Sequence, residues 1–211
     1  MTPVQFITHR TARYGYVEGA LMALEGGCRW IQLRMKEAPD DDVRAAAAAL
    51  LPRCRACGAV LILDDRVTLA RETGADGVHL GKTDMPVAEA RRLLGSGFII
   101  GGTANTLDDI VSHARQGADY IGCGPFRFTE TKKNLAPVLG LDGYRQIMAG
   151  LRELGLRLPV VAIGGIRADD LPDLAATGVD GVAVSGSVLG SDDPVAAMAR
   201  LVSLNTCFQK K

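Results

Sequence analysis

Three carboxylates occur where two neighbouring apolar runs of the sequence end. Asp64 and Asp65 follow one run directly, and Asp84 follows the next run in the segment LGKTD. Neighbouring strands of a sheet lie about 4.8 Å apart, so carboxylates from consecutive loops can share one hard cation such as Mg2+. The competing interpretation is that these residues cap the helices that follow them.

Cationic and amide side chains follow an earlier apolar run. In IQLRMK, residues 31–36, Gln32, Arg34 and Lys36 are spaced two apart. A strand would send all three to one side, where they could hold a phosphorylated ligand. The competing interpretation is a solvated strand end.

Glycine-rich segments end two later apolar runs, at Ile163 to Ile166 and at Val184 to Ser187. Glycines allow backbone N–H groups to approach a phosphate closely, and the loops after strands seven and eight of an α/β barrel commonly hold one. A neutral phosphate site would therefore lie beside the more charged one. Two such sites indicate a transferase with two phosphorylated substrates, one of them a diphosphate that leaves.

Eight apolar segments alternate with helical stretches, at about 25 residues per unit. The expected strands are Val4–Thr8, Trp30–Arg34, Val60–Leu63, Gly77–Leu80, Phe98–Gly101, Tyr120–Gly122, Val160–Ile163 and Gly181–Val184. The expected helices are Val17–Glu25, Asp41–Arg55, Val67–Glu72, Val87–Leu94, Leu107–Gln116, Tyr144–Leu154, Leu171–Ala176 and Pro194–Leu204. We therefore predict one domain over residues 1–211, a single (β/α)8 TIM barrel, rather than a doubly wound open sheet.

One connection is longer than the others. Residues 125–141 show no clear period, and the segment would follow a strand on the catalytic face. It contains Thr129, Thr131 and Lys132, which suit a phosphate.

A small pattern occurs three times, with a helix-ending glycine followed by Asp76, Asp119 or Asp180 and a strand. In a barrel these aspartates would lie at the amino-terminal ends of the strands, the stabilising face. We predict a structural role for them.

Composition excludes several classes of protein. The 24 basic and 24 acidic side chains give a formal net charge of +0, which predicts no nucleic-acid partner. The longest apolar run, Ala45 to Leu51, is far shorter than the roughly 20 residues of a membrane-spanning helix, so no membrane association is expected. The start of the chain lacks an export signal, and the five cysteines are interpreted as reduced thiols of a cytoplasmic protein. The sequence leaves open whether the chain forms a homo-oligomer.

At these residues the sequence closely resembles the thiamine phosphate synthase family, over about residues 4 to 204. The motifs that carry the resemblance are IQLRMK (31–36), DDRVTLA (64–70), GVHLGKTD (77–84), GPFRFTETKK (124–133) and AIGGI (162–166). The resemblance implies that 4-amino-2-methyl-5-hydroxymethylpyrimidine diphosphate is joined to hydroxyethylthiazole phosphate. The products would be thiamine phosphate and diphosphate. In the family, diphosphate leaves together with Mg2+, and the thiazole nitrogen captures the resulting pyrimidine methyl cation.

The resemblance also implies roles for individual residues. The pyrimidine diphosphate would be held by Gln32, Arg34, Lys36 and Lys132, with Thr103 lining the pyrimidine pocket, and Mg2+ by Asp65 and Asp84. The thiazole phosphate would be held by Thr129, Thr131, Gly165, Val184 and Ser185. Arg34, Lys36 and Lys132 are the residues expected to act in catalysis.

Several positions depart from the family pattern. Asp64 stands where the family generally has an Asn that touches diphosphate, and unit charges 4 Å apart would repel by about 4 kcal/mol at an effective dielectric of 20. We favour Asp64 as a further Mg2+ ligand. The alternatives are that Asp64 is protonated, or that it replaces a neutral diphosphate contact with Lys82 as a compensating charge. Thr103 replaces a usual Ser, and Arg127 a usual Phe.

Two alternative functions remain. The related thiazole tautomerases use a His after strand six, where this chain has Pro125, so a tautomerase or a non-catalytic phosphate-binding paralogue ranks second. A Schiff-base aldolase would need a desolvated Lys36 or Lys132.

Overall fold

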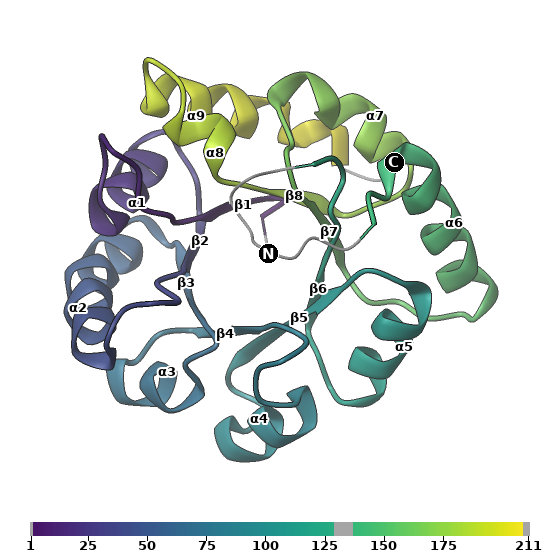
Figure 1. Ribbon diagram of the computed structural model, residues 1–211, viewed down its shortest axis with the longest axis horizontal. Coiled ribbons are helices and arrows are strands. Elements are labelled where there is room, and N and C mark those ends of the chain that lie inside the picture. Colours follow the sequence, from purple (N-terminus) through teal and green to yellow (C-terminus); the bar gives the residue numbers. More distant parts are fainter. Residues whose placement is uncertain (1, 129–136, 209–211) are drawn as a thin grey trace.

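The chain folds into a closed barrel of eight parallel strands in sequence order, in a computed structural model that describes residues 2–128 and 137–208. Figure 1 looks along the barrel and shows the ring of strands with the helices outside it. The strands are β1 (Val4–Ile7), β2 (Trp30–Leu33), β3 (Val60–Asp64), β4 (Gly77–Leu80), β5 (Ile99–Ala104), β6 (Tyr120–Cys123), β7 (Val160–Ile163) and β8 (Gly181–Val184). The predicted TIM barrel is confirmed, because β1 pairs with both β2 and β8.

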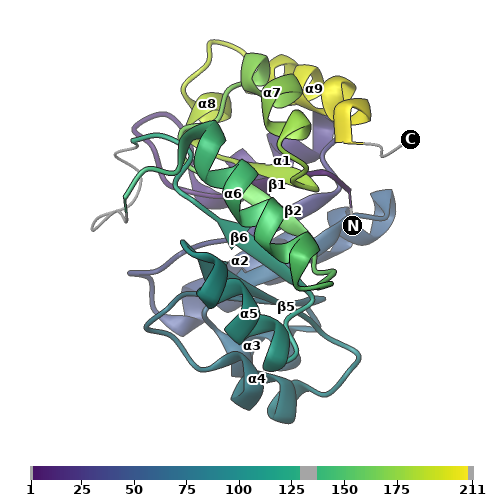
Figure 2. The same ribbon diagram turned by 90° about the vertical axis from the view of Figure 1, so that its right-hand side faces the viewer.

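A helix follows each strand on the outside of the ring, and Figure 2 shows α5 and α6 from their outer side. The α-helices are α1 (Tyr16–Glu25), α2 (Asp40–Cys57), α3 (Val67–Thr73), α4 (Val87–Leu94), α5 (Leu107–Arg115), α6 (Gly140–Glu153), α7 (Leu171–Ala176), α8 (Gly186–Leu189) and α9 (Pro194–Ser203). Two 3-10 turns, η1 (Ala168–Asp170) and η2 (Leu204–Phe208), complete the elements.

Strand alternation divides the apolar residues into two cores. Trp30 and Ile62 belong to a cluster inside the barrel, whereas Ile31 and Leu61 belong to the larger cluster between the strands and the helices. In β2, therefore, the even-numbered side chains point inward. The same alternation directs Gln32 and, beyond the strand, Arg34 toward the mouth of the barrel.

The main differences from the predicted elements occur at glycines. β5 extends to Ala104 instead of ending at Gly101. Gly102 pairs with Leu80 of β4 and with Ile121 of β6, and Thr103 pairs with Gly122 of β6. α6 begins at Gly140 rather than Tyr144, and α8 was not predicted. In β5, strand pairing on both sides overrides the weak strand propensity of Gly102.

The three repeated aspartates perform the predicted structural role. Asp76, Asp119 and Asp180 each accept a hydrogen bond from the first or second backbone N–H of a neighbouring strand, at 2.7, 2.7 and 2.9 Å. The donors belong to Leu61, Ile100 and Val160. These carboxylates accept hydrogen bonds from backbone N–H groups at the starts of the strands, on the barrel face opposite the loops that follow β7 and β8.

Candidate active site

At the carboxyl ends of β2 to β4, two carboxylates converge on one ammonium group. Lys36 Nζ lies 3.4 Å from Asp84 Oδ1 and 3.9 Å from Asp65 Oδ2. Lys36 is partly exposed, while both carboxylates are largely buried, with side-chain exposures of 9% for Asp65 and 13% for Asp84. The three loops therefore bring together the charges that the sequence predicted would meet.

Backbone contacts hold the two carboxylates in place. Asp65 has a left-handed backbone, with φ of 58°, and its N–H donates to the carbonyl of His79 at 2.9 Å. Asp84 Oδ2 accepts from the N–H of Gly81 at 2.7 Å. Asp84 thus closes its own loop, and Asp65 is fixed against β4.

The helix-capping interpretation of these carboxylates is wrong. α3 begins after Arg66 and α4 after Pro86, and neither helix has a side-chain cap. Asp65 and Asp84 lie instead in the loops at the carboxyl ends of β3 and β4, where they contact His79 and Gly81.

Burial raises the pKa of Asp65, opposed by the adjacent Arg66 guanidinium and reinforced by Asp84. Arg66 is hydrogen bonded to Asp65 and pairs with Asp40 as well. A divalent cation between Asp65 and Asp84 would relieve the repulsion between them. No group of three His, Cys, Asp or Glu side chains in residues 2–128 and 137–208 is arranged to hold a metal. Two carboxylates completed by phosphate oxygens and water are nevertheless the ligand set that Mg2+ takes in phosphate chemistry, so these residues fit it.

Asp64 is engaged separately from this pair. Its Oδ1 accepts from Gln32 Nε2 at 2.6 Å, and its Oδ2 lies 3.7 Å from Arg34 Nε. Burial raises the pKa of Asp64 to about 6, with Arg34 opposing the shift. Lys82 does not compensate this charge, because its ammonium pairs with Asp109 at 2.7 Å.

Thr103 lies near the end of β5 and is hydrogen bonded to two histidines. Its hydroxyl lies 2.9 Å from His79 Nε2, and its carbonyl lies 3.0 Å from His113 Nε2. His79 is a hydrogen-bonded residue of the core, and His113 of α5 is half-buried with its ring turned toward β5. Gly102 leaves room for this ring, since a Cβ there would lie 2.8 Å from the His113 ring.

Across the barrel mouth, the loop after β7 has a left-handed glycine backbone, a conformation that allows backbone N–H groups to approach a phosphate closely. Gly164 and Gly165 both have positive φ, 104° and 67°. Arg127, which follows β6, donates to the carbonyl of Gly165 at 2.9 Å and makes two hydrogen bonds of 2.7 Å to Asp170. A side chain on Gly165 would collide with Arg127.

Ser185 follows β8 and precedes α8. Its hydroxyl donates to the carbonyl of Ile7 and lies 2.7 Å from His9 Nδ1, which therefore donates to it. Burial, with Arg34 nearby, lowers the pKa of His9. Val184 is buried in the outer core, so only its backbone is available to a ligand.

Thr129, Thr131 and Lys132 lie outside the described residues. On either side of them, Phe126 N–H donates to the carbonyl of Ile163 at 2.8 Å, and Leu139 N–H donates to that of Pro125 at 2.9 Å. The long connection is thus anchored to β7 where it leaves the barrel.

Comparison with known proteins decides the family. Residues 4–188 match the family described as thiamine monophosphate synthase. The thiamine-phosphate synthases of Bacteroides thetaiotaomicron and Bacteroides fragilis are 58% and 59% identical to this chain over 204 residues. These alignments cover 97% of this chain and 98% and 100% of the relatives. The chain belongs to the thiamine monophosphate synthase family.

Structural similarity agrees with this membership. The thiamine phosphate pyrophosphorylase of Pyrococcus furiosus superposes with a TM-score of 0.87 at 34% identity, covering 99% of this chain and 98% of that one. As a member of the thiamine monophosphate synthase family, the protein is a transferase of thiamine biosynthesis. Across the part of the chain that the structure describes, no helix is long and apolar enough to span a membrane.

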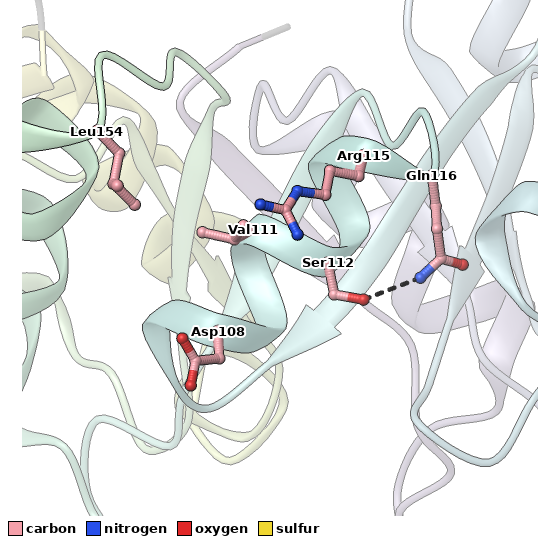
Figure 3. A pocket seen from close by; sticks show the side chains of 6 residues that line it. All are labelled: Asp108, Val111, Ser112, Arg115, Gln116 and Leu154. Carbon is pink, nitrogen blue, oxygen red and sulfur yellow. Dashed lines mark hydrogen bonds between the residues drawn. The ribbon is translucent and has the colours of Figure 1, made fainter.

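A cavity of about 520 Å3 lies elsewhere, between α5 and α6 on the outer surface (Figure 3). Its lining includes Ser112, which accepts a hydrogen bond from Gln116, and Leu154. It contains none of the residues that the thiamine monophosphate synthase motifs supply.

Proposed function

We propose that this protein joins 4-amino-2-methyl-5-hydroxymethylpyrimidine diphosphate to hydroxyethylthiazole phosphate, forming thiamine phosphate and diphosphate. The observation that supports this most directly is Lys36, which lies between Asp65 and Asp84 at the carboxyl ends of neighbouring strands. This combination of charges suits a diphosphate bound with a divalent cation, which a monophosphate alone would not require.

The leaving diphosphate would be neutralised by side chains of the segment that follows β2 and of the long connection. Arg34 and Lys36 present cations at one rim, and Lys132 would add a third. Gln32 would orient the pyrimidine. As the bond between the pyrimidine methylene carbon and the diphosphate oxygen breaks, the electron pair leaves with the diphosphate, and these cations stabilise the developing charge.

Asp65 and Asp84 would hold Mg2+. When bound, the ion supplies further charge neutralisation for the departing diphosphate. Lys36 balances the same two carboxylates and would turn to the diphosphate oxygens as the substrate binds.

The thiazole phosphate would lie at the opposite rim. Gly165 and the backbone of Val184 would offer N–H groups, and Ser185 a hydroxyl, with Thr129 and Thr131 completing the site. The thiazole nitrogen would then face the methylene carbon and form the new carbon–nitrogen bond.

The alternative functions receive less support. Pro125, which follows β6, has no group that transfers a proton, as a tautomerase requires at that place. The ammonium group of Lys36 forms ion pairs with two carboxylates, whereas imine formation needs a free amine beside a carbonyl substrate.

The cytoplasm is the proposed location, and small phosphorylated molecules are the proposed partners. Cys28, Cys54, Cys57, Cys123 and Cys207 are all free thiols, as a reducing compartment favours.

The test is to incubate the purified protein with both substrates and to measure thiamine phosphate and diphosphate with Mg2+ and with EDTA. Equal amounts of both products are expected, only with the cation. An Asp142→Asn variant, altered at an exposed carboxylate paired with Arg145, is the matched control and should match the unmodified protein. Absence of product from folded protein, or turnover in EDTA, would contradict the proposal.

A further inference from the structure

A chain of three hydrogen bonds crosses the inside of the barrel from β1 to the mouth. Gln5 Nε2 lies 3.3 Å from Tyr120 Oη, which lies 3.0 Å from His79 Nδ1. His79 Nε2 in turn lies 2.9 Å from Thr103 Oγ1. Gln5, Tyr120 and His79 are buried, whereas Thr103 is half-buried at the carboxyl end of β5.

Glycines in β5 and β6 leave space for these two rings. A Cβ on Gly101 would lie 2.2 Å from Tyr120 Cζ and 2.6 Å from His79 Nδ1. A Cβ on Gly122 would lie 3.0 Å from His79 Cε1. Trp30 packs edge-on against Tyr120 at 4.8 Å between ring centroids. Packing therefore fixes both rings, and the hydrogen bonds are not an incidental contact.

The donors and acceptors in this chain can be assigned from one end to the other. The amide nitrogen of Gln5 can only donate, so Tyr120 Oη accepts from it. In the assignment that uses every donor once, the phenol proton of Tyr120 is directed to His79 Nδ1. A neutral imidazole that accepts at Nδ1 carries its proton at Nε2. In this tautomer His79 donates to Thr103 Oγ1, and the Thr103 hydroxyl proton is left for an acceptor beyond the chain.

The backbone of Thr103 is fixed independently. His113 of α5 reaches the Thr103 carbonyl from outside the barrel, at 3.0 Å, through the space that Gly102 leaves. The carbonyl oxygen and the hydroxyl oxygen of Thr103 are both hydrogen bonded to histidines. The hydroxyl proton of Thr103 can therefore be donated to a ligand.

We propose that His79 is a positioning residue that makes the Thr103 hydroxyl a hydrogen-bond donor to a ring nitrogen of the pyrimidine substrate. The inference rests on the proposed function for the identity of that ligand. It assigns to Gln5 and Tyr120 the task of selecting the imidazole tautomer, and it requires no change in the charge of His79.

The first test measures the tautomer without any substrate. Long-range 1H–15N spectra of protein labelled at its three histidines report which ring nitrogen carries the proton, and His79→Gln identifies the His79 signals. We expect His79 with its proton on Nε2, and loss of that fixed tautomer in Tyr120→Phe. A proton on Nδ1 in the unmodified protein would overturn the proposal, whatever reaction the protein catalyses.

The second test measures kinetics. Thr103→Val should raise the KM for the pyrimidine diphosphate about tenfold, the effect of one lost hydrogen bond, and leave the KM for the thiazole phosphate unchanged. Thr103→Ser, which keeps the hydroxyl, should restore it. Tyr120→Phe should raise the same KM in the unmodified background and have no further effect in the Thr103→Val background.

Tyr144→Phe is the matched control for loss of a buried phenol. Tyr144 donates to the carbonyl of Cys123 at 2.7 Å in the outer core, away from the hydrogen-bond chain. It should lower thermal stability without changing either KM. Equal effects of Tyr120→Phe in both backgrounds would show that Tyr120 does not act through Thr103 and would overturn the proposal. If the unmodified protein makes no thiamine phosphate, the proposed function fails, while the tautomer measurement still decides the hydrogen-bond polarity.

Discussion

Arg127 and Asp170 are joined by two parallel hydrogen bonds of 2.7 Å that tie the segment after β6 to the turn after β7. The same guanidinium donates to the Gly165 carbonyl and lies 4.6 Å above the ring of Phe126. Planar, two-point pairing fixes orientation as well as distance. Arg127 thus braces the loop that is proposed to hold the thiazole phosphate.

Arg127→Ala is therefore expected to raise the KM for the thiazole phosphate about tenfold and to leave that for the pyrimidine diphosphate unchanged. Because the pair is partly exposed, the loss in the free energy of unfolding should be only about 1 kcal/mol. Steady-state kinetics with each substrate varied in turn is the measurement. Arg200→Ala, which removes an exposed pair with Asp169, is the control, and an equal effect there would show that Arg127 has no special role.

Asp84→Asn is expected to raise the Mg2+ concentration for half-maximal activity at least tenfold. Asp84 is one of two carboxylates near Lys36, and an amide is a weaker ligand for a hard cation. Titration of Mg2+ at saturating substrates measures this. An unchanged midpoint with a proportionate fall in kcat would assign Asp84 to loop geometry through Gly81 instead.

Asp64→Asn distinguishes the two roles that the sequence left open. The carboxylate faces Gln32 and Arg34, so its removal should free Arg34 for the diphosphate and remove a repulsion. We expect a several-fold lower KM for the pyrimidine diphosphate and an unchanged Mg2+ midpoint, since solvent screens most of the roughly 4 kcal/mol of direct repulsion. A raised Mg2+ midpoint would instead identify Asp64 as a metal ligand.

The sequence predicted the barrel because periodicity and repeated glycine–aspartate patterns are local, and the thiamine phosphate synthase motifs identified the rim residues. The sequence could not predict which ion pairs the charged side chains form. Lys82, expected to compensate Asp64, pairs with Asp109 of α5, and the contact of the His113 ring with β5 depends on the missing side chain at Gly102. Such contacts join residues from different βα units, and only the closed ring sets their distances.

His9 gives a pH dependence of stability. Burial lowers its pKa in the folded state, with Arg34 adding to the effect. As pH falls below about 6.5, the unfolded chain takes up a proton that the folded chain resists, so the free energy of unfolding falls until the folded-state pKa is reached. Urea unfolding between pH 7.5 and 5.5 should show a larger loss in the unmodified protein than in His9→Gln. Since His9 is partly exposed, the difference should be below about 1 kcal/mol, and parallel curves would contradict it.

Asp180→Ala tests the face of the barrel away from the chemistry. Asp180 accepts the Val160 N–H at 2.9 Å, and Val160 is fully buried at the start of β7. Removing the carboxylate leaves this donor unpaired, which should lower the free energy of unfolding by about 1–3 kcal/mol.

Because the site lies at the opposite ends of the strands, kcat and both KM values of Asp180→Ala should be unchanged at a temperature where the variant is folded. Asp180→Asn, whose amide oxygen still accepts, should recover most of the stability. Asp173→Ala, at an exposed position in the first turn of α7, is a matched acidic control. A change in KM for the thiazole phosphate in Asp180→Ala would show instead that β7 transmits its position from one end of the barrel to the other.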